Sequence, residues 1–264
     1  MFDRLQKGWQ LSKLSLKTIY ENKSLMIFPI VSTLSLILVL ASFTIGIFAV
    51  GIDNAEAYLI GAVFPFYLIC YFLIIFFNSA LIHCAMKIFK GEETSLGDGM
   101  SFASSRIGKI LSWAFVSAIV GTLLNMLQNS NKVGEIIASI IGIVWSIMTF
   151  FVVPILIYED KGVMESIKGS IQMMKEKWGE SLVANFSFGI FQFLGILIGI
   201  VLGFVFGAIH PVLGVLVGGI IIALVSIATS AATTVFIAAV YSNTRDLPTG
   251  PFQADVLDAA FRQK

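Results

Sequence analysis

The chain has 264 residues, of which 57% are hydrophobic and only 12% are charged. A soluble domain carries roughly 25% charged residues and about 45–50% apolar ones, so this composition excludes a soluble domain and indicates a membrane-embedded protein. The formal net charge of +1 gives no electrostatic reason to expect nucleic acid as a partner. Cys70 and Cys84 lie in one apolar stretch, where fourteen residues of helix separate them by about 21 Å, so they cannot form a disulfide with each other.

Charged residues divide the sequence into uncharged stretches, each long enough to cross a membrane, which takes about 20 apolar residues. The last stretch, between Glu180 and Arg245, is long enough for two crossings, and His210-Pro211 predicts the turn between them because proline ends the preceding helix. The predicted fold class is an all-α polytopic membrane protein, with residues 1–264 forming a single integral membrane domain. The predicted membrane-spanning helices lie near residues 25–50, 57–86, 110–128, 136–158, 181–208 and 212–242.

Lysine and arginine lie almost entirely on one side of this predicted topology. Sixteen of the seventeen are in the N-terminal segment, the second and fourth connections and the C-terminal tail, whereas Lys132 alone lies on the other side. Basic residues are enriched in cytoplasmic loops, so these segments are predicted to be cytoplasmic. Both termini are therefore expected in the cytoplasm.

Three of the cytoplasmic segments combine basic residues with a mixed-polarity, helix-compatible pattern directly before a span. In the first, Trp9, Leu16, Ile19 and Tyr20 fall near one side of a helix. This pattern is typical of short cytoplasmic interfacial helices that lie at headgroup level, although any basic cytoplasmic loop would look similar, and both interpretations stay open. A short amphipathic tail is also expected at 245–264. The three segments are residues 8–25, 95–111 and 166–182.

The chain resembles a family of uncharacterised six-span prokaryotic membrane proteins, a domain of unknown function. The stretches that carry the resemblance are MFDRLQKGWQLSKLSLKTIYENKSLMIFPIVS, VVPILIYEDKGVMESIKGSIQMMKEKWG and LPTGPFQADVLDAAFRQK. That family is distantly similar to the membrane domain of some glycerophosphodiester phosphodiesterases. The resemblance implies a multi-pass protein of the prokaryotic cytoplasmic (inner) membrane and supplies no activity. This chain lacks the soluble phosphodiesterase barrel, so that enzyme activity does not transfer.

No catalytic residue, metal site or cofactor is predicted. Every Asp and Glu lies at a span end or in a connection, whereas coupled transporters usually place an acidic group within the bilayer. Two histidines without carboxylates at ligand spacing do not define a metal site. His83 is expected to be hydrogen-bonded near the headgroups, with a proton or ligand contact as the alternative. Glu159 and Asp160 could join other cytoplasmic acids in a hydrolase or cation site, but solvated loop ends explain them better.

Small residues recur on one face of each of the last two spans. Glycine at every fourth position of the fifth span makes a groove in which another backbone can approach closely. Two interpretations stay open: a tight hairpin of spans five and six whose hydroxyls bond their own helix, or a face that meets another subunit or lines a polar path. The helix-packing candidates are Gly195, Gly199, Gly203, Gly207 and Gly219. The polar-path candidates are Ser226, Ser230 and Thr233.

Three hypotheses for function follow. The first is a non-enzymatic, self-associating integral membrane protein, either a passive conduit or a lipid-handling component, whose partners are membrane lipids and further copies of the chain. The second is a membrane scaffold or accessory subunit that docks a cytoplasmic protein partner through its interfacial helices and tail. The third is a coupled transporter or an intramembrane enzyme.

Overall fold

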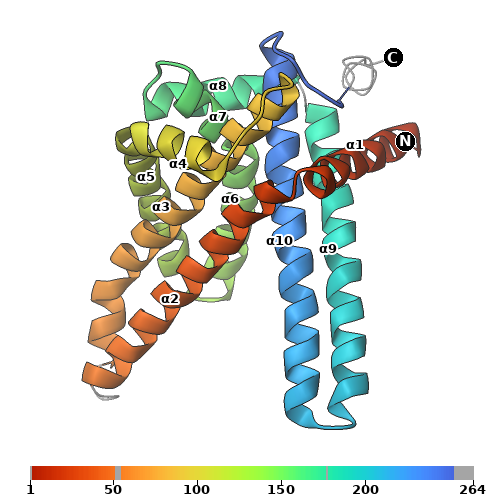
Figure 1. The fold of residues 1–264 in the computed structure, drawn as a ribbon. Helices are drawn as coiled ribbons and strands as arrows, with labels where there is room; N and C mark the ends of the chain where they lie inside the picture. Colours follow the sequence, from red (N-terminus) through yellow and green to blue (C-terminus); the bar gives the residue numbers. More distant parts are fainter. Residues whose placement is uncertain (1, 51–54, 177, 253–264) are drawn as a thin grey trace. The chain divides into compact units, whose positions relative to one another are not determined.

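The computed structural model describes residues 2–50, 55–176 and 178–252, and every regular element in these ranges is a helix (Figure 1). Six helical stretches are long and apolar enough to cross a membrane, which confirms the predicted all-α polytopic fold. The predicted amphipathic helix of the tail lies mostly outside the described residues. The six stretches are Lys23–Ala49, Gly61–Phe89, Ile107–Gln128, Lys132–Tyr158, Phe188–Gly207 and Pro211–Thr244.

The chain forms two compact units, and each unit is assembled from separate stretches of sequence. Unit 1 consists of Met1–Pro29, Cys84–Leu96 and Lys177–Lys264. Unit 2 consists of Ile30–His83 and Gly97–Glu176.

Unit 1 is built on a hairpin of two long helices, α9 (Trp178–Gly207) and α10 (Pro211–Thr244), which run side by side (Figure 1). The predicted turn lies between them: Pro211 occupies the start of α10, and His210 Nδ1 accepts a hydrogen bond from Val212 N at 3.3 Å. Proline suits this position because the first amide of a helix has no intrahelical acceptor. Helix α1 (Phe2–Glu21) crosses the hairpin and contacts both of its helices, and a 3₁₀ turn, η1 (Lys23–Met26), follows it.

The buried face of α1 differs from the predicted apolar side. Tyr20, expected on that side, is 75% exposed, whereas Ile19 is buried as expected. Three small hydroxyl residues share the buried face, and two of them donate to carbonyls of their own helix at 3.0 and 2.9 Å. Self-satisfied hydroxyls let a neighbouring backbone approach closely, which a bulky ring would prevent. The buried residues of this face are Leu11, Ser12, Ser15, Thr18 and Ile19.

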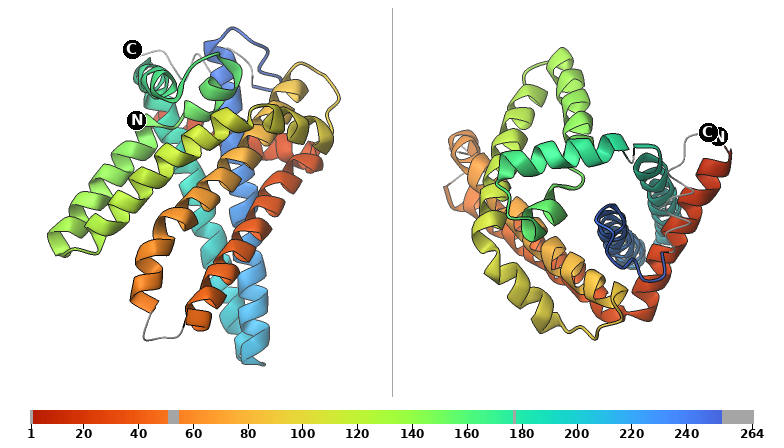
Figure 2. Two further views of the ribbon diagram at one scale, coloured as in Figure 1. Left: turned by 90° about the vertical axis from the view of Figure 1, so that its left-hand side faces the viewer. Right: turned by 90° about the horizontal axis from the view of Figure 1, so that it is seen from above.

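Unit 2 contains most of α2 (Ile27–Val50) and α3 (Ala55–Phe89), followed by α4 (Leu96–Ser105), α5 (Ile107–Gln128), α6 (Lys132–Met148), α7 (Val152–Tyr158) and α8 (Val163–Glu176). Helices α5 and α6 form a second hairpin (Figure 2). Its turn is tight because Asn131 Oδ1 caps α6 by accepting from Gly134 N at 2.9 Å. Trp113 and Trp145 stack across the two helices at 5.7 Å.

The helix is broken inside the predicted span 136–158. Helix α6 ends at Met148 and α7 begins at Val152. Pro154 explains the break, because it has no amide hydrogen to donate to the carbonyl of Phe150 and its ring would collide with that carbonyl. The amide of Phe151 donates instead to Ser170 Oγ of α8 at 3.0 Å. This bond links α8 to the residue directly before α7.

Candidate functional site

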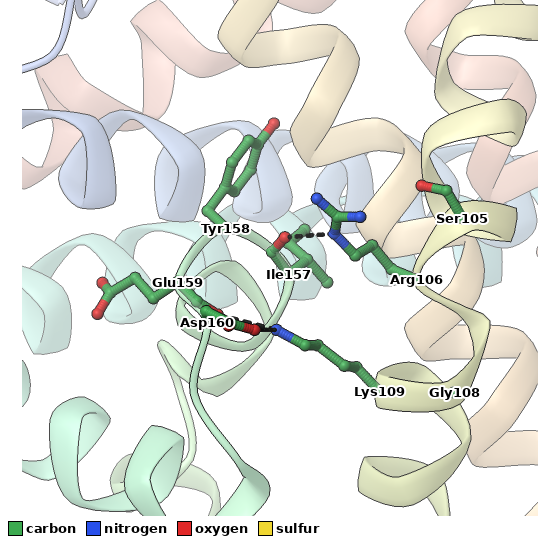
Figure 3. A pocket seen from close by; sticks show the side chains of 8 residues that line it. All are labelled: Ser105, Arg106, Gly108, Lys109, Ile157, Tyr158, Glu159 and Asp160. Atoms are coloured by element: carbon green, nitrogen blue, oxygen red, sulfur yellow. Dashed lines mark hydrogen bonds and ion pairs between the residues drawn. The ribbon is translucent and has the colours of Figure 1, made fainter.

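The start of α5 and the end of α7 line an open cavity of about 380 Å³ within unit 2 (Figure 3). Both helices contribute to membrane-crossing stretches, and the cavity lies where one stretch begins and the other ends. Its wall combines charged side chains with apolar surface. The lining residues are Ser105, Arg106, Gly108, Lys109, Ile157, Tyr158, Glu159 and Asp160.

Two cations from α5 and its N-cap hold the carboxyl end of α7. Arg106 Nε donates to the carbonyl of Ile157 at 3.2 Å, and Lys109 Nζ donates to the carbonyl of Glu159 at 3.1 Å. The last carbonyls of a helix have no intrahelical partner and carry partial negative charge, so cations stabilise them. These bonds fix the two ends of the cavity wall against each other.

The carboxylates of the wall are already paired with lysines. Asp160 Oδ1 lies 3.1 Å from Lys109 Nζ, and Glu159 Oε2 lies 2.6 Å from Lys161 Nζ. Figure 3 shows the Glu159 carboxylate pointing away from the two cations of α5. Arg106 has no carboxylate partner among the residues that the structure describes. Because Glu159 is paired with Lys161, which lies outside the cavity wall, Arg106 is left as a positive charge without a paired carboxylate among the described side chains.

An aromatic stack supports the guanidinium of Arg106. Its Cζ lies 5.4 Å from the centre of the Phe102 ring, a cation–π distance. Phe102 in turn stacks on His83 with ring centres 4.0 Å apart, and His83 Nδ1 lies 3.0 Å from Tyr158 Oη. His83 thus has the kind of hydrogen-bonded position expected for it. The stack joins α3, α4 and α7 beside the cavity.

The predicted glycines of α9 lie against α10 in the hairpin. A Cβ placed on Gly199 would lie 2.6 Å from Ile222 Cγ1 and 3.1 Å from the carbonyl of Gly218. At Gly203 it would lie 3.2 Å from the carbonyl of Gly214. At these positions the two helices are too close for a side chain between them, so these glycines pack α9 against α10 of the same chain. The α9 residues in this position are Gly195, Gly199, Gly203 and Gly207.

The α10 side of this contact is formed by Gly214 and Gly218, which the sequence did not single out. A Cβ on Gly218 would lie 2.9 Å from the carbonyl of Gly199 and 3.2 Å from Gly203 Cα. Gly219 lies outside the contact, because a Cβ placed there meets no described atom within 4 Å. It lines an open apolar groove of about 390 Å³, whose wall also includes glycines of the hairpin contact such as Gly203 and Gly218. The glycines of the two helices facing each other are called the glycine seam below.

The three predicted path hydroxyls do not share one environment. Ser226 Oγ accepts from Gln192 Nε2 of α9 at 2.7 Å, which places it between the two helices. Thr233 Oγ1 donates to the carbonyl of Thr229 in its own helix at 2.9 Å. Ser230 is exposed on the surface of α10. Two of the three are therefore engaged in packing or in their own helix.

Within the described ranges, no three His, Cys, Asp or Glu residues are grouped closely enough to hold a metal ion. Glu159 and Asp160 lie at the end of α7, in contact with lysines.

The cavity was not predicted from the sequence. Its available signal was the pair Arg106 and Lys109 at the start of one span, together with the Tyr-Glu-Asp-Lys run that ends the next.

The fold and its sites define a polytopic all-α membrane protein with a charged cavity at the end of its spanning helices. The chain belongs to a family of unknown function (DUF6159), whose family model matches residues 56–251. The match includes all cavity residues and both helices of the glycine seam. No curated protein and no solved structure matches the chain.

Proposed function

We propose that the protein is a non-enzymatic integral membrane protein that binds and handles membrane lipids. The observation that carries this proposal is the cavity at Arg106 and Lys109, which opens where α5 begins and α7 ends. Ends of membrane-crossing helices lie at headgroup level, where lipid phosphates and glycerol groups are found. A cavity with cationic and apolar walls at that depth suits an amphipathic ligand better than a water-soluble one.

Lipid retention tests this proposal directly. The protein should be purified in mild detergent, its bound lipids extracted and quantified by mass spectrometry, and the stripped protein reconstituted with the same lipids. We expect phospholipid to remain bound through purification and to raise the thermal unfolding midpoint when it is added back, because a ligand that binds only the folded state stabilises it. A stripped protein that neither rebinds lipid nor gains stability from it would exclude a lipid-binding role.

The orientation of the protein is part of the same proposal. The distribution of basic residues supports cytoplasmic termini and a cavity at the cytoplasmic leaflet, and the resemblance to an uncharacterised family of six-span prokaryotic membrane proteins supports a prokaryotic inner membrane.

Cysteine accessibility tests this orientation in a background with Cys70→Ser and Cys84→Ala. An impermeant thiol reagent applied to intact cells should label Asn54→Cys and Lys132→Cys. It should label Asp98→Cys and Asp255→Cys only after the membrane is opened. The reverse pattern would place the cavity in the outer leaflet.

A passive conduit along α10 receives less support than lipid binding, because Ser226 and Thr233 already have hydrogen-bond partners. We expect the combined change Ser226→Ala, Ser230→Ala and Thr233→Val to leave the flux of ions and small solutes into liposomes unchanged. Stability should fall slightly, because an interhelical hydrogen bond in a membrane protein contributes about 0.6 kcal/mol on average. A large loss of flux with intact assembly would favour the conduit instead.

Self-association is supported by the open apolar groove that Gly219 lines together with glycines of the seam, because small residues at a helix surface allow another helix to approach closely. The contact between α9 and α10 is made within one chain, so a second copy would pack on the open side of this groove or on another lipid-facing surface. Particle size in mild detergent, measured by light scattering, decides between a single chain and an oligomer.

The scaffold hypothesis depends on the tail, which lies mostly outside the described residues, and co-purification of a cytoplasmic protein would support it.

A further inference from the structure

We infer that the cavity of unit 2 binds the phosphodiester group of an anionic phospholipid, with the guanidinium of Arg106 as its main contact. This inference rests on the proposed lipid binding and names the chemical group that the site recognises.

The charge balance of the cavity favours a ligand with one negative charge. Both carboxylates of the wall are paired with lysines, at 3.1 Å for Asp160 and 2.6 Å for Glu159. Arg106 contributes the remaining positive charge. A phosphodiester carries one negative charge and so matches the cavity, whereas a lipid with a neutral sugar headgroup does not.

The donors of Arg106 are available to such a ligand. Only Nε has a hydrogen-bond partner within the described part of the chain, the carbonyl of Ile157. Figure 3 shows the two terminal nitrogens on the side between Tyr158 and Ser105, both of which line the cavity. A planar guanidinium with two adjacent donors fits two oxygens of a phosphate, which a lysine cannot reproduce.

The surroundings hold Arg106 in this orientation before a ligand arrives. The Nε bond fixes one side of the guanidinium, and the Phe102 ring supports its face at 5.4 Å. Phe102 is itself stacked on His83 at 4.0 Å. A donor that is already oriented loses little conformational freedom on binding, which increases affinity.

Lys109 is a second cation that the ligand can recruit. Its partner Asp160 is fully exposed, and ion pairs to exposed carboxylates are weak. A phosphodiester bound at Arg106 can therefore replace Asp160 at Lys109 without breaking the bond from Lys109 to the carbonyl of Glu159.

The test compares lipid affinities of the full chain in detergent by native mass spectrometry. Phosphatidylglycerol is the anionic probe, and diglucosyl-diacylglycerol is the matched lipid without phosphate. We expect Arg106→Gln to weaken phosphatidylglycerol binding about tenfold or more, because it removes charge-assisted hydrogen bonds. Arg106→Lys keeps the positive charge but lacks the two adjacent donors of the guanidinium, so it should weaken phosphatidylglycerol binding less than Arg106→Gln does. If Arg106→Gln does not fold, the comparison is made with Arg106→Lys alone. The control is Lys168→Gln, an exposed residue of α8, which should bind as the unchanged protein does.

Each outcome decides a separate point. Equal phosphatidylglycerol binding by the unchanged protein and both Arg106 variants would overturn the inference while lipid binding itself survived. Equal affinity of the unchanged protein for the two lipids would also overturn it. Displacement of phosphatidylglycerol by millimolar inorganic phosphate would assign the site to a free anion rather than to a lipid. If the unchanged protein binds neither lipid, the proposed function and the inference are both overturned.

Discussion

Replacing Gly218 with alanine should lower the thermal unfolding midpoint of the protein, whereas the same replacement at the adjacent Gly219 should raise it. A Cβ on Gly218 would lie 2.9 Å from the carbonyl of Gly199, a backbone atom that cannot turn aside. Overpacking of this kind costs roughly 1–3 kcal/mol. A Cβ placed on Gly219 has no described atom within 4 Å, so alanine there contributes only its better helix propensity, about 1 kcal/mol.

The two variants differ by one position and share the same chemistry, so general effects of detergent or expression cancel between them. Gly214→Ala should be at least as damaging as Gly218→Ala, because its Cβ would meet the carbonyl of Gly203 and lie 2.6 Å from Gly207 Cα. Thermal unfolding followed by size-exclusion chromatography measures all three. Equal midpoints for Gly218→Ala and Gly219→Ala would show that the seam is not formed in the membrane protein.

The glycine seam shows what helix periodicity can and cannot predict. The four-residue spacing in α9 was enough to find the face that approaches another backbone, because residues four apart share one side of a helix. The partner positions in α10 were missed, since Gly218 and Gly219 are both available in sequence and point about 100° apart around the helix. Only the register between the two helices decides which of them faces α9, and register depends on packing along the whole hairpin.

The cavity shows a different limit. The long apolar stretches and the placement of basic residues were sufficient for the six spans, because both follow from composition over many residues. The contacts of Arg106 and Lys109 depend instead on where the last carbonyls of α7 point, about fifty residues further along the chain. That direction follows from the break before α7. Pro154 signals a break, but it does not specify the direction that the next helix takes.

One buried hydrogen bond stabilises the break that Pro154 causes, and removing this bond should have the second large effect. Ser170 is fully buried, and its Oγ accepts from the amide of Phe151 at 3.0 Å. Ser170→Ala leaves that amide without an acceptor in a buried place, where an unpaired donor costs about 1–3 kcal/mol. We expect a lower unfolding midpoint and faster hydrogen exchange at the Phe151 amide.

Ser166→Ala is the matched control, because Ser166 is equally buried one turn earlier in α8. Its Oγ donates to the carbonyl of Gly162, and that carbonyl also accepts from the amide of Ser166, so it keeps a partner when the hydroxyl is lost. Ser166→Ala should therefore cost well under half as much as Ser170→Ala. Because α7 presents the carbonyls of Ile157 and Glu159 to the cavity cations, Ser170→Ala should also weaken phosphatidylglycerol binding, and Ser166→Ala should not. Equal effects of the two changes on stability and on lipid binding would show that the break is held by apolar packing rather than by this bond.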